Sequence, residues 1–471
     1  MVQKVFDKVE DIGQERLSTT WVITTKISEG KEITKARLVA RGYEEDSSNI
    51  RSDSPTCQKA NVRMLLAIAV AKQWTVRSLD IKAAFLQGKE IERELCLQPP
   101  KEFREKGVIW KLKKVVYGLC DASRNWYLKV LEVLESLGMK VSKWDKAVFT
   151  YKKEEIEGIV LIHVDDLLFF GSSEFYLEVM SQFKNIFMIS REDKQAFKYL
   201  GIVLTQNKDG TIILDQKSFL DSMEVDLLQK EDMKDKERTA NKEEIRLFRQ
   251  GVGKLGWITS ITKPEAALSF CILSTKQSQP IISDFIKFRK AVKDLKTGEA
   301  WIKIPKLNLQ HLQVIVFSDA SFGNLPNGAS QLGYIIFVGD EYGNVAPISW
   351  ISKKARRIAR STLTAETLAA VDAVDMAMMI SSCLEDLLNR SLPPVRLYTD
   401  NKSLYDSART TNLLEDKRLQ IEMNALREMI DNHQIQIEWV STSNQIADVL
   451  TKLGADKKKL TDVLSSGVLQ F

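Results

Sequence analysis

The feature that most constrains the fold is a pair of adjacent carboxylates between two apolar runs. Residues 159–162 and 167–170 are apolar or aromatic, and Asp165 and Asp166 lie between them, with Gly171 at the end. Short runs of this composition are typical of strands, so we expect a buried β-hairpin with the acids near its turn. Burying two unpaired carboxylates would cost on the order of several kcal/mol each, which a divalent metal ion would offset. A surface β-turn, where aspartate is common, is the alternative at this stage.

Length and composition limit the class of protein. A chain of 471 residues is longer than one hydrophobic core usually serves, so two to four domains are expected. A net charge of +5 permits a nucleic-acid partner. The five cysteines include no CxxC pair, which predicts neither a disulfide framework nor a zinc site and fits a reducing compartment. The chain has no signal-peptide pattern at its start and no uninterrupted apolar run long enough to span a bilayer, so no membrane partner is expected.

A basic strand is predicted near the N-terminus. Residues 21–25 and 33–42 alternate in the manner of strands, and residues 29–31 are typical of a hairpin turn between them. Lys35, Arg37 and Arg41 occupy alternate positions of the second strand, so they share one face. Such a row of cations could hold a polyphosphate. The alternative is a solvated outer face.

Further acids are predicted at the ends of strands or on helices. Residues 76–81 read as a strand ending near Asp80 and leading into a short helical turn, after a helix over 61–74 with one apolar face. In the C-terminal third, the strands 314–321 and 395–401 end at Asp319 and Asp400.

The helices of the second half complete this pattern. A long helix over 364–387 carries Glu366 near its start, and a final helix over 444–453 holds Asp448. Residues 216–305 are predicted to be mostly helical, and the last residues, from 455, to be a tail.

These acids form two sets: Asp80, Asp165 and Asp166, and then Asp319, Glu366, Asp400 and Asp448. Carboxylates that converge from separate elements would bind two Mg²⁺ ions, which require oxygen ligands. Two such ions, roughly 3.5–4 Å apart, stabilise the entering and leaving oxygens of an in-line phosphoryl displacement. Any one of these acids could belong to a structural turn, but seven acids in two coherent sets favour metal sites.

The order of the motifs resembles the reverse transcriptase and RNase H portion of a copia-type LTR-retrotransposon Pol polyprotein, from about Trp21 to Leu453. The motifs that carry the resemblance are residues 36–42 (ARLVARG), 79–88 (LDIKAAFLQG), 98–100 (QPP), 117–119 (YGL), 163–168 (HVDDLL), 198–201 (KYLG), 318–320 (SDA), 349–354 (SWISKK), 365–366 (AE), 399–401 (TDN) and 446–452 (IADVLTK). Their combination is specific, although no single one of them would be.

The resemblance implies a multidomain chain of α/β and α+β class. A right-hand polymerase with fingers, palm and a helical thumb-like region would be followed by an RNase H-like α/β domain. The implied domains are fingers and palm over 1–215, the helical thumb or connection region over 216–310, the RNase H-like domain over 311–455, and a tail over 456–471.

The resemblance also implies roles for individual residues. The polymerase metal ligands would be Asp80, Asp165 and Asp166, and the RNase H metal ligands would be Asp319, Glu366, Asp400 and Asp448. The nucleotide would be met by Lys35, Arg37, Phe85, Tyr117 and Gly118, and the primer end would be positioned by Lys198, Tyr199, Leu200 and Gly201. Phe85 would exclude a 2′-hydroxyl, and an ordinary core aromatic is the alternative. Within the acidic pair, Asp165 is the firmer expected ligand, and Asp166 is expected to be partly structural.

The activity implied is that of an RNA-directed DNA polymerase with RNase H, using Mg²⁺ or Mn²⁺. Its partners would be an RNA template, a DNA primer, the RNA–DNA hybrid, dNTPs and other Pol or Gag segments, in the cytoplasm within a virus-like particle or in the nucleus. Two alternatives remain: a transposon relic that acts as a nucleic-acid-binding or interaction protein, and a protein with only the RNase H activity.

The chain departs from the family pattern at four places. Residues 361–366 read STLTAE where SSTEAE is usual, although Glu366 remains. His163 stands where the family usually has tyrosine, and a histidine near a core is its alternative role. Residues 120–124 read CDASR where KQAPR is usual, so Asp121 is expected to repel a triphosphate. Residues 441–444 (STSN) hold no histidine before the last acid, although some RNases H have one there.

Overall fold

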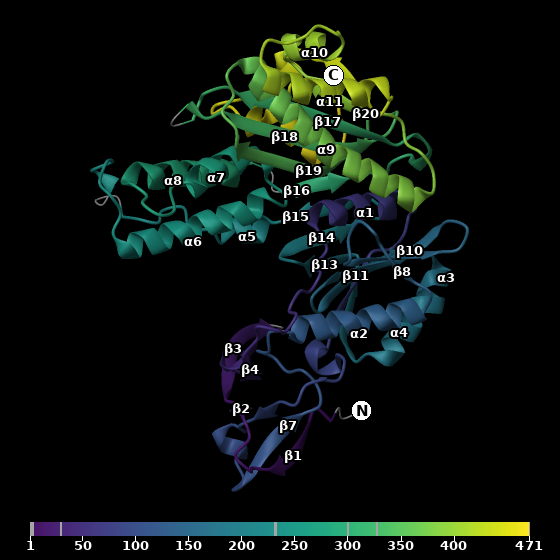
Figure 1. Ribbon diagram of the computed structural model, residues 1–471, viewed down its shortest axis with the longest axis vertical. Helices are drawn as coiled ribbons and strands as arrows, with labels where there is room; N and C mark the ends of the chain where they lie inside the picture. The colour runs from purple at the N-terminus through teal and green to yellow at the C-terminus, as the bar shows by residue number, and fades with distance from the viewer. Residues whose placement is uncertain (1–3, 29–30, 230–232, 299–300, 326–327, 471) are drawn as a thin grey trace. The chain divides into compact units, whose positions relative to one another are not determined.

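The structure is a computed structural model that describes residues 4–28, 31–229, 233–298, 301–325 and 328–470 (Figure 1). The chain divides into two compact units, Met1–Gln58 with Val76–Lys194, and Lys59–Thr75 with Gln195–Phe471. The first unit is interrupted by a segment that belongs to the second. The functional domain division given above stays a prediction.

The first unit is built on a six-stranded sheet with the order β12-β5-β11-β10-β9-β8. Its strands are β5 (Arg77–Ile81), β8 (Lys140–Val141), β9 (Val148–Lys152), β10 (Ile156–His163), β11 (Asp166–Gly171) and β12 (Ile189–Lys194). β10 and β11 form the expected hairpin, and Leu161 and Leu168 are paired and fully buried. Helix α2 (Ala122–Ser136) contributes Trp126 and Leu134 to the core of this sheet. Shorter helical segments follow the hairpin: α3 (Ser173–Phe175), a π-helical turn (Tyr176–Met180) and α4 (Ser181–Ile186).

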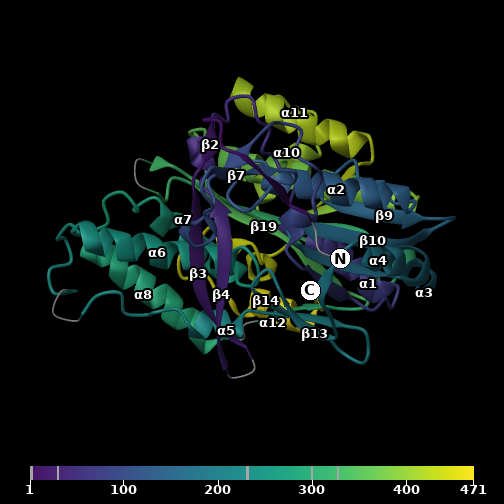
Figure 2. The same ribbon diagram turned by 90° about the horizontal axis from the view of Figure 1, so that it is seen from below.

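Two smaller sheets complete the first unit. β3 (Thr19–Ser28) and β4 (Lys31–Ala40) pair along their whole length as a two-stranded ribbon, which Figure 2 shows lengthwise. The turn residues Glu29 and Gly30 lie outside the described residues. A four-stranded sheet, β1-β7-β6-β2, contains β1 (Phe6–Glu10), β2 (Arg16–Leu17), β6 (Cys96–Leu97) and β7 (Val108–Leu112). The ribbon carries the basic strand that the sequence predicts.

The second unit contains helices and a small sheet before its main sheet. The helices are α1 (Lys59–Ala71), α5 (Lys217–Asp221), α6 (Lys242–Thr259), α7 (Ala267–Ser274) and α8 (Ile282–Thr297), and the sheet is β13 (Ala196–Tyr199), β14 (Ile202–Gln206), β15 (Ile212–Asp215) and β16 (Trp301–Ile304). The prediction of one apolar face for α1 is wrong, because every residue from Asn61 to Val70 is buried. The reason is tertiary: α1 packs on a strand of the main sheet, where Arg63 donates to the Ile348 carbonyl at 2.8 Å.

The main sheet of the second unit has the order β19-β18-β17-β20-β21. Its strands are β17 (Gln313–Ser321), β18 (Gln331–Gly339), β19 (Val345–Lys354), β20 (Val395–Thr399) and β21 (Ile435–Trp439). β17 pairs antiparallel with β18 and parallel with β20, so the sheet is mixed. Helix α9 (Thr362–Leu388) packs on β17 and β18, and α10 (Lys402–Ala408) and α11 (Lys417–Asp431) follow β20 (Figure 1). The sheets and helices of both units give a mixed α/β architecture, as the sequence predicts.

Helix α9 also has the length and composition of a membrane span, which the sequence did not single out. Asp372 and Asp375 interrupt its apolar surface, and 56% of its most apolar window is buried within the protein. Its contacts with the sheet account for that composition, because a central core helix is apolar around much of its circumference.

The C-terminal segment differs from the expectation in two respects. The final helix expected over 444–453 is wrong, because Asp448–Leu450 forms only a 3₁₀ turn after the extended Gln445. The Gln445 side chain donates to the Ser318 carbonyl and accepts from the Ala447 amide, which holds this stretch out of a helix. The segment expected to be a tail contains α12 (Lys458–Ser466), whose residues Leu460 and Leu464 are buried.

Candidate active sites

The acidic turn between β10 and β11 is held by backbone geometry and by one tryptophan. His163 pairs with Asp166 across the turn, and Val164 takes the left-handed conformation, with φ +58°. The indole Nε1 of Trp126 donates to the Val164 carbonyl at 2.6 Å from a fully buried position in α2. The turn that carries Asp165 is therefore anchored to the core.

Asp80 and Asp165 line one cavity of about 760 Å³ in the first unit. β5 pairs with β11 so that Asp80 lies opposite Asp166, which brings the first predicted set of acids together. The same cavity is lined by Lys35 and Arg37 of β4. Ser190 donates from its hydroxyl to Asp80 Oδ2 at 2.6 Å, which fixes that carboxylate. Acids and cations thus face one space from separate strands.

Asp166 differs from its neighbour. Among the described residues that line the cavity, the carboxylates are those of Asp80 and Asp165. Burial raises the pKa of Asp166 to about 6, and the nearby charges of Asp165 and Asp80 add to the effect. A carboxyl group in this environment resists ionisation unless a cation is close.

Two glycines allow the turn that carries Tyr117 to approach β4 closely. Tyr117 lines the cavity and accepts a hydrogen bond from the Ala40 amide to its carbonyl at 2.8 Å. Gly118 has φ +96°, and a Cβ there would lie 2.0 Å from the Ala40 carbonyl oxygen. A Cβ on Gly42 would meet the Gly118 carbonyl at 2.2 Å. Both positions therefore need glycine so that the turn after β7 can touch β4.

Phe85 lies against Tyr117, with ring centroids 4.9 Å apart. It is partly buried and packs on the core of the six-stranded sheet and on a second core beside the four-stranded sheet. Ala83 and Leu86, on either side of it, line the cavity. The pKa of the Tyr117 phenol is raised, first by burial and then by the charge of Asp165.

Asp121 and His163, where the chain departs from the expected motifs, lie in the first unit. Asp121 is buried and forms an ion pair with Arg93 at 2.6 Å, and Arg93 also pairs with Glu45. Arg93 therefore offsets part of the charge of Asp121, and the expected repulsion of a triphosphate by Asp121 stays a prediction. His163 is half-buried, burial lowers its pKa, and no described group bonds its Nδ1.

In the second unit, Asp319, Asp400 and Asp448 converge. One carboxylate oxygen of each lies within 4.8 Å of those of the others, a grouping able to hold a metal ion. Asp319 is on β17, Asp400 follows β20, and Asp448 begins the 3₁₀ turn. Because β17 and β20 are parallel neighbours, their ends bring two of these acids to one edge of the sheet.

Glu366, near the start of α9, adjoins this cluster and fits a metal site. The pKa of Glu366 is raised to about 9, chiefly by burial and in addition by the charges of Asp319 and Asp400. No described residue bonds its buried Oε2. Burial also raises the pKa of Asp319 to about 7. Hard oxygen donors with an unsatisfied buried carboxylate oxygen are the donor set that Mg²⁺ or Mn²⁺ takes.

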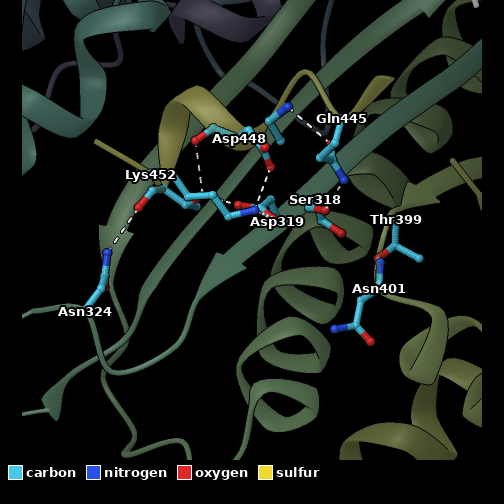
Figure 3. Close-up of polar contacts among 10 residues, drawn as sticks. Ser318, Asp319, Asn324, Thr399, Asn401, Gln445, Asp448 and Lys452 are labelled. Carbon is cyan, nitrogen blue, oxygen red and sulfur yellow. Dashed lines mark hydrogen bonds and ion pairs between the residues drawn. The ribbon is translucent and has the colours of Figure 1, made fainter. Parts of the chain in front are cut away.

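Lys452 lies among the same acids (Figure 3). Its Nζ is 3.0 Å from Asp319 Oδ1 and 2.8 Å from Asp448 Oδ1. Both contacts raise its pKa, against the effect of burial. The neighbouring Thr451 hydroxyl donates to the other oxygen of Asp319.

The residues predicted to position a primer lie in the second unit. Lys198 and Tyr199 end β13, and Leu200 and Gly201, both with positive φ, form the turn to β14, so their role at a primer end stays a prediction. None of the sequence patterns described above predicts the contacts of Trp126 or of Lys452. The spacing of Lys452, four residues after Asp448, is a signal for an ion pair that could have been used.

The geometry can now be compared with known proteins. The family described as reverse transcriptase (RNA-dependent DNA polymerase) matches residues 3–241, half of the chain, and the chain belongs to this family. The Pol polyprotein of transposon RE2 from Arabidopsis thaliana is 27% identical over 454 residues, covering 92% of this chain and 30% of the relative. The Pol polyprotein of transposon TNT 1-94 from Nicotiana tabacum is 24% identical, covering 94% and 35%. The resemblance to copia-type Pol polyproteins is confirmed, and the chain spans about a third of these relatives' length.

A solved structure supports the fold. The foamy viral protease-reverse transcriptase, determined in complex with double-stranded DNA, matches with a TM-score of 0.55 and 13% identity. The match covers 92% of this chain and 67% of that one. At this identity the likeness shows a shared fold.

Proposed function

We propose that the chain is an RNA-directed DNA polymerase that also cleaves the RNA strand of the hybrid. The observation that carries the polymerase proposal is the cavity in which Asp80 and Asp165 face Lys35, Arg37 and Tyr117. Two carboxylates suit metal ions, and two cations suit a triphosphate, so together they suit a metal-bound deoxynucleotide. Family membership supports the same reaction.

The residues that line the cavity would have different roles in the reaction. Asp80 and Asp165 would hold Mg²⁺ or Mn²⁺, which supplies charge stabilisation for the attack of a primer 3′-hydroxyl on the α-phosphate. Lys35 and Arg37 would neutralise the triphosphate and the leaving pyrophosphate. Tyr117 would lie under the nucleotide, and Phe85, packed against it, would limit the space beside the sugar and exclude a 2′-hydroxyl.

Nucleic acid would be the larger partner. The foamy viral relative was solved with double-stranded DNA, which supports a duplex substrate here. We propose an RNA template, a DNA primer and their hybrid, bound through phosphate and helical shape. Binding should therefore be independent of sequence and weaken steeply with salt.

A second activity, RNase H, is favoured by the cluster of Asp319, Asp400 and Asp448. It lies on a mixed sheet at the ends of parallel strands, with Glu366 beside it. These four acids would hold the metal ions, and the carboxylates would orient a water for attack on the scissile phosphate of the RNA.

Primer extension on poly(rA)/oligo(dT) with Mg²⁺ or Mn²⁺ tests the polymerase. Asp165→Asn should reduce synthesis by more than about a hundredfold, since even supporting residues of a metal site are worth 10–100-fold. Synthesis by the wild type that does not exceed this variant would contradict the polymerase and favour a nucleic-acid-binding relic.

Cleavage of a labelled RNA–DNA hybrid tests the nuclease separately. Asp400→Asn should abolish cleavage and leave primer extension intact, while Asp165→Asn should do the reverse. Cleavage without synthesis would leave the RNase H-only alternative, and cleavage that survives Asp400→Asn would remove this cluster from the proposal.

A further inference from the structure

Lys452 is the one cation that the structure places in contact with the acids of the second cluster, among the residues it describes. Its Nζ contacts Asp319 and Asp448 at 3.0 and 2.8 Å. Both acids belong to the group whose oxygens lie within 4.8 Å of one another. Figure 3 shows the ammonium directed toward the space between the two carboxylates. The ammonium therefore uses oxygens that a metal ion would need.

The position of Lys452 is built into the fold. The Ser352 hydroxyl donates to the Leu450 carbonyl at 2.5 Å, and the Asn324 amide donates to the Thr451 carbonyl at 3.2 Å. A Cβ on Gly333 of β18 would meet Leu450 at 2.7 Å and Thr451 at 2.8 Å, so this glycine lets the segment lie on the sheet. These contacts hold the backbone next to Lys452 against β18, β19 and the loop that contains Asn324.

Electrostatic repulsion between the neighbouring acids explains why a cation at Lys452 would stabilise them. Asp319 and Asp448 lie close together, and Asp319 is almost completely buried. As carboxylates they would repel one another without a counter-charge. A lysine side chain is a flexible stem with a compact charge, so it can fill the position and also withdraw from it. The Lys452 side chain is 38% exposed, which leaves a path outward.

We propose that the Lys452 ammonium is a resident counter-cation of the second carboxylate cluster, which orders Asp319 and Asp448 when no metal is bound and competes with the divalent ion for them. This inference rests on the proposed RNase H metal site. Lys452 is thus a positioning residue that sets metal affinity, and metal binding displaces its ammonium from the two carboxylates.

The test is calorimetric titration with Mg²⁺ of full-length chains that also carry Asp80→Asn and Asp165→Asn, so that the first site is silent. Lys452→Met should bind Mg²⁺ about tenfold more tightly, the factor that roughly 1.4 kcal/mol of relieved competition gives. Lys452→Arg, which keeps the charge, should remain near the wild-type affinity. Lys353→Met is the matched control, because Lys353 has a similar exposure of 34% but pairs with Asp372.

Reductive methylation of the wild type, read by mass spectrometry, gives a second measurement that needs no variant to fold. Lys452 should become more reactive when Mg²⁺ replaces EDTA, and Lys353 should not change. Wild-type or weaker Mg²⁺ affinity in Lys452→Met, or Lys452 labelling that ignores Mg²⁺, would overturn the inference alone. Absence of Mg²⁺ binding in both the wild-type second site and Asp400→Asn would overturn the proposed metal site as well.

Discussion

The two carboxylate clusters of this chain solve the same electrostatic problem in different ways. Asp80 and Asp165 face an open cavity whose cations, Lys35 and Arg37, come from another strand and do not touch them in any described ion pair. Asp319 and Asp448 are in direct contact with Lys452. Under our proposals, the first arrangement would leave its cations for a substrate, and the second would use its cation to order the carboxylates when no metal is bound. The two clusters therefore differ in whether a cation is in direct contact with the carboxylates.

The largest expected contrast is in the response to pH without metal. Burial raises the pKa of Glu366 from 4.5 to about 9. Because the folded pKa is the higher one, the folded state binds the extra proton, and stability present below pH 4.5 is lost as pH rises toward 9. Calorimetric unfolding in EDTA should show the second unit losing up to about 1.4 kcal/mol per pH unit across this window.

Glu366→Gln should flatten that dependence. In the first unit, the pKa of the Asp166 carboxyl group is raised to about 6 from 3.8. The stability that its protonation adds is therefore already lost above pH 6. A Glu366→Gln protein that keeps the wild-type slope between pH 6 and 9 would break the contrast between the two units.

The next prediction concerns the anchor of the acidic turn. Trp126→Phe removes the donor to the Val164 carbonyl and leaves a cavity, so the free energy of unfolding should fall by about 2–3 kcal/mol. Primer extension should fall on the order of tenfold to a hundredfold, because displacement of Asp165 misaligns the reacting atoms.

Tyr127→Phe is the matched control for Trp126→Phe. Tyr127 lies on the same helix and donates to the Lys146 carbonyl at 2.8 Å, away from the turn. It should lose about 1 kcal/mol of stability and keep primer extension. Equal losses of primer extension in both variants would indicate that the packing of α2, and not the hydrogen bond to the acidic turn, controls synthesis.

Gly118→Ala tests the close approach of Tyr117 to β4. The new Cβ would lie 2.0 Å from the Ala40 carbonyl oxygen. We therefore expect the free energy of unfolding to fall by about 1–3 kcal/mol and the KM for dNTP to rise. Gly13→Ala separates strain from crowding, since Gly13 also has positive φ but nothing within 4 Å of its Cβ position. Steady-state kinetics in which the two variants behave alike would contradict the packing argument.

The smallest effect is expected at Asp121. Asp121→Gln restores the residue usual in the family, yet KM for dNTP should change by less than about twofold, because Arg93 pairs with Asp121 and offsets part of its charge. Arg37→Gln, in the cavity, should raise the same KM by about tenfold or more. A large improvement in KM for Asp121→Gln would restore the repulsion that the sequence suggested.

The sequence was informative where local pattern and chemistry coincide. The hairpin around Asp165, the strand ending near Asp319 and the long helix carrying Glu366 follow from the spacing of apolar residues, which local sequence encodes. The convergence of acids at one sheet edge followed from strand ends and from family resemblance.

The rest depended on contacts between distant segments. The burial of α1 from Asn61 to Val70 arises from packing on β19, and the missing helix after Gln445 arises from its bond to Ser318, 127 residues away. The anchoring of Val164 by Trp126 also joins separate segments. No spacing within a short window contains this information.

We expect the chain to have two separate metal sites. Anomalous scattering from crystals of the 471-residue chain soaked with Mn²⁺ tests this expectation. Density should lie between Asp80 and Asp165, and separate density should lie among Asp319, Asp400 and Asp448, with the Lys452 ammonium moved away from the second position. Mn²⁺ at only one of the two clusters, or at neither, would contradict it.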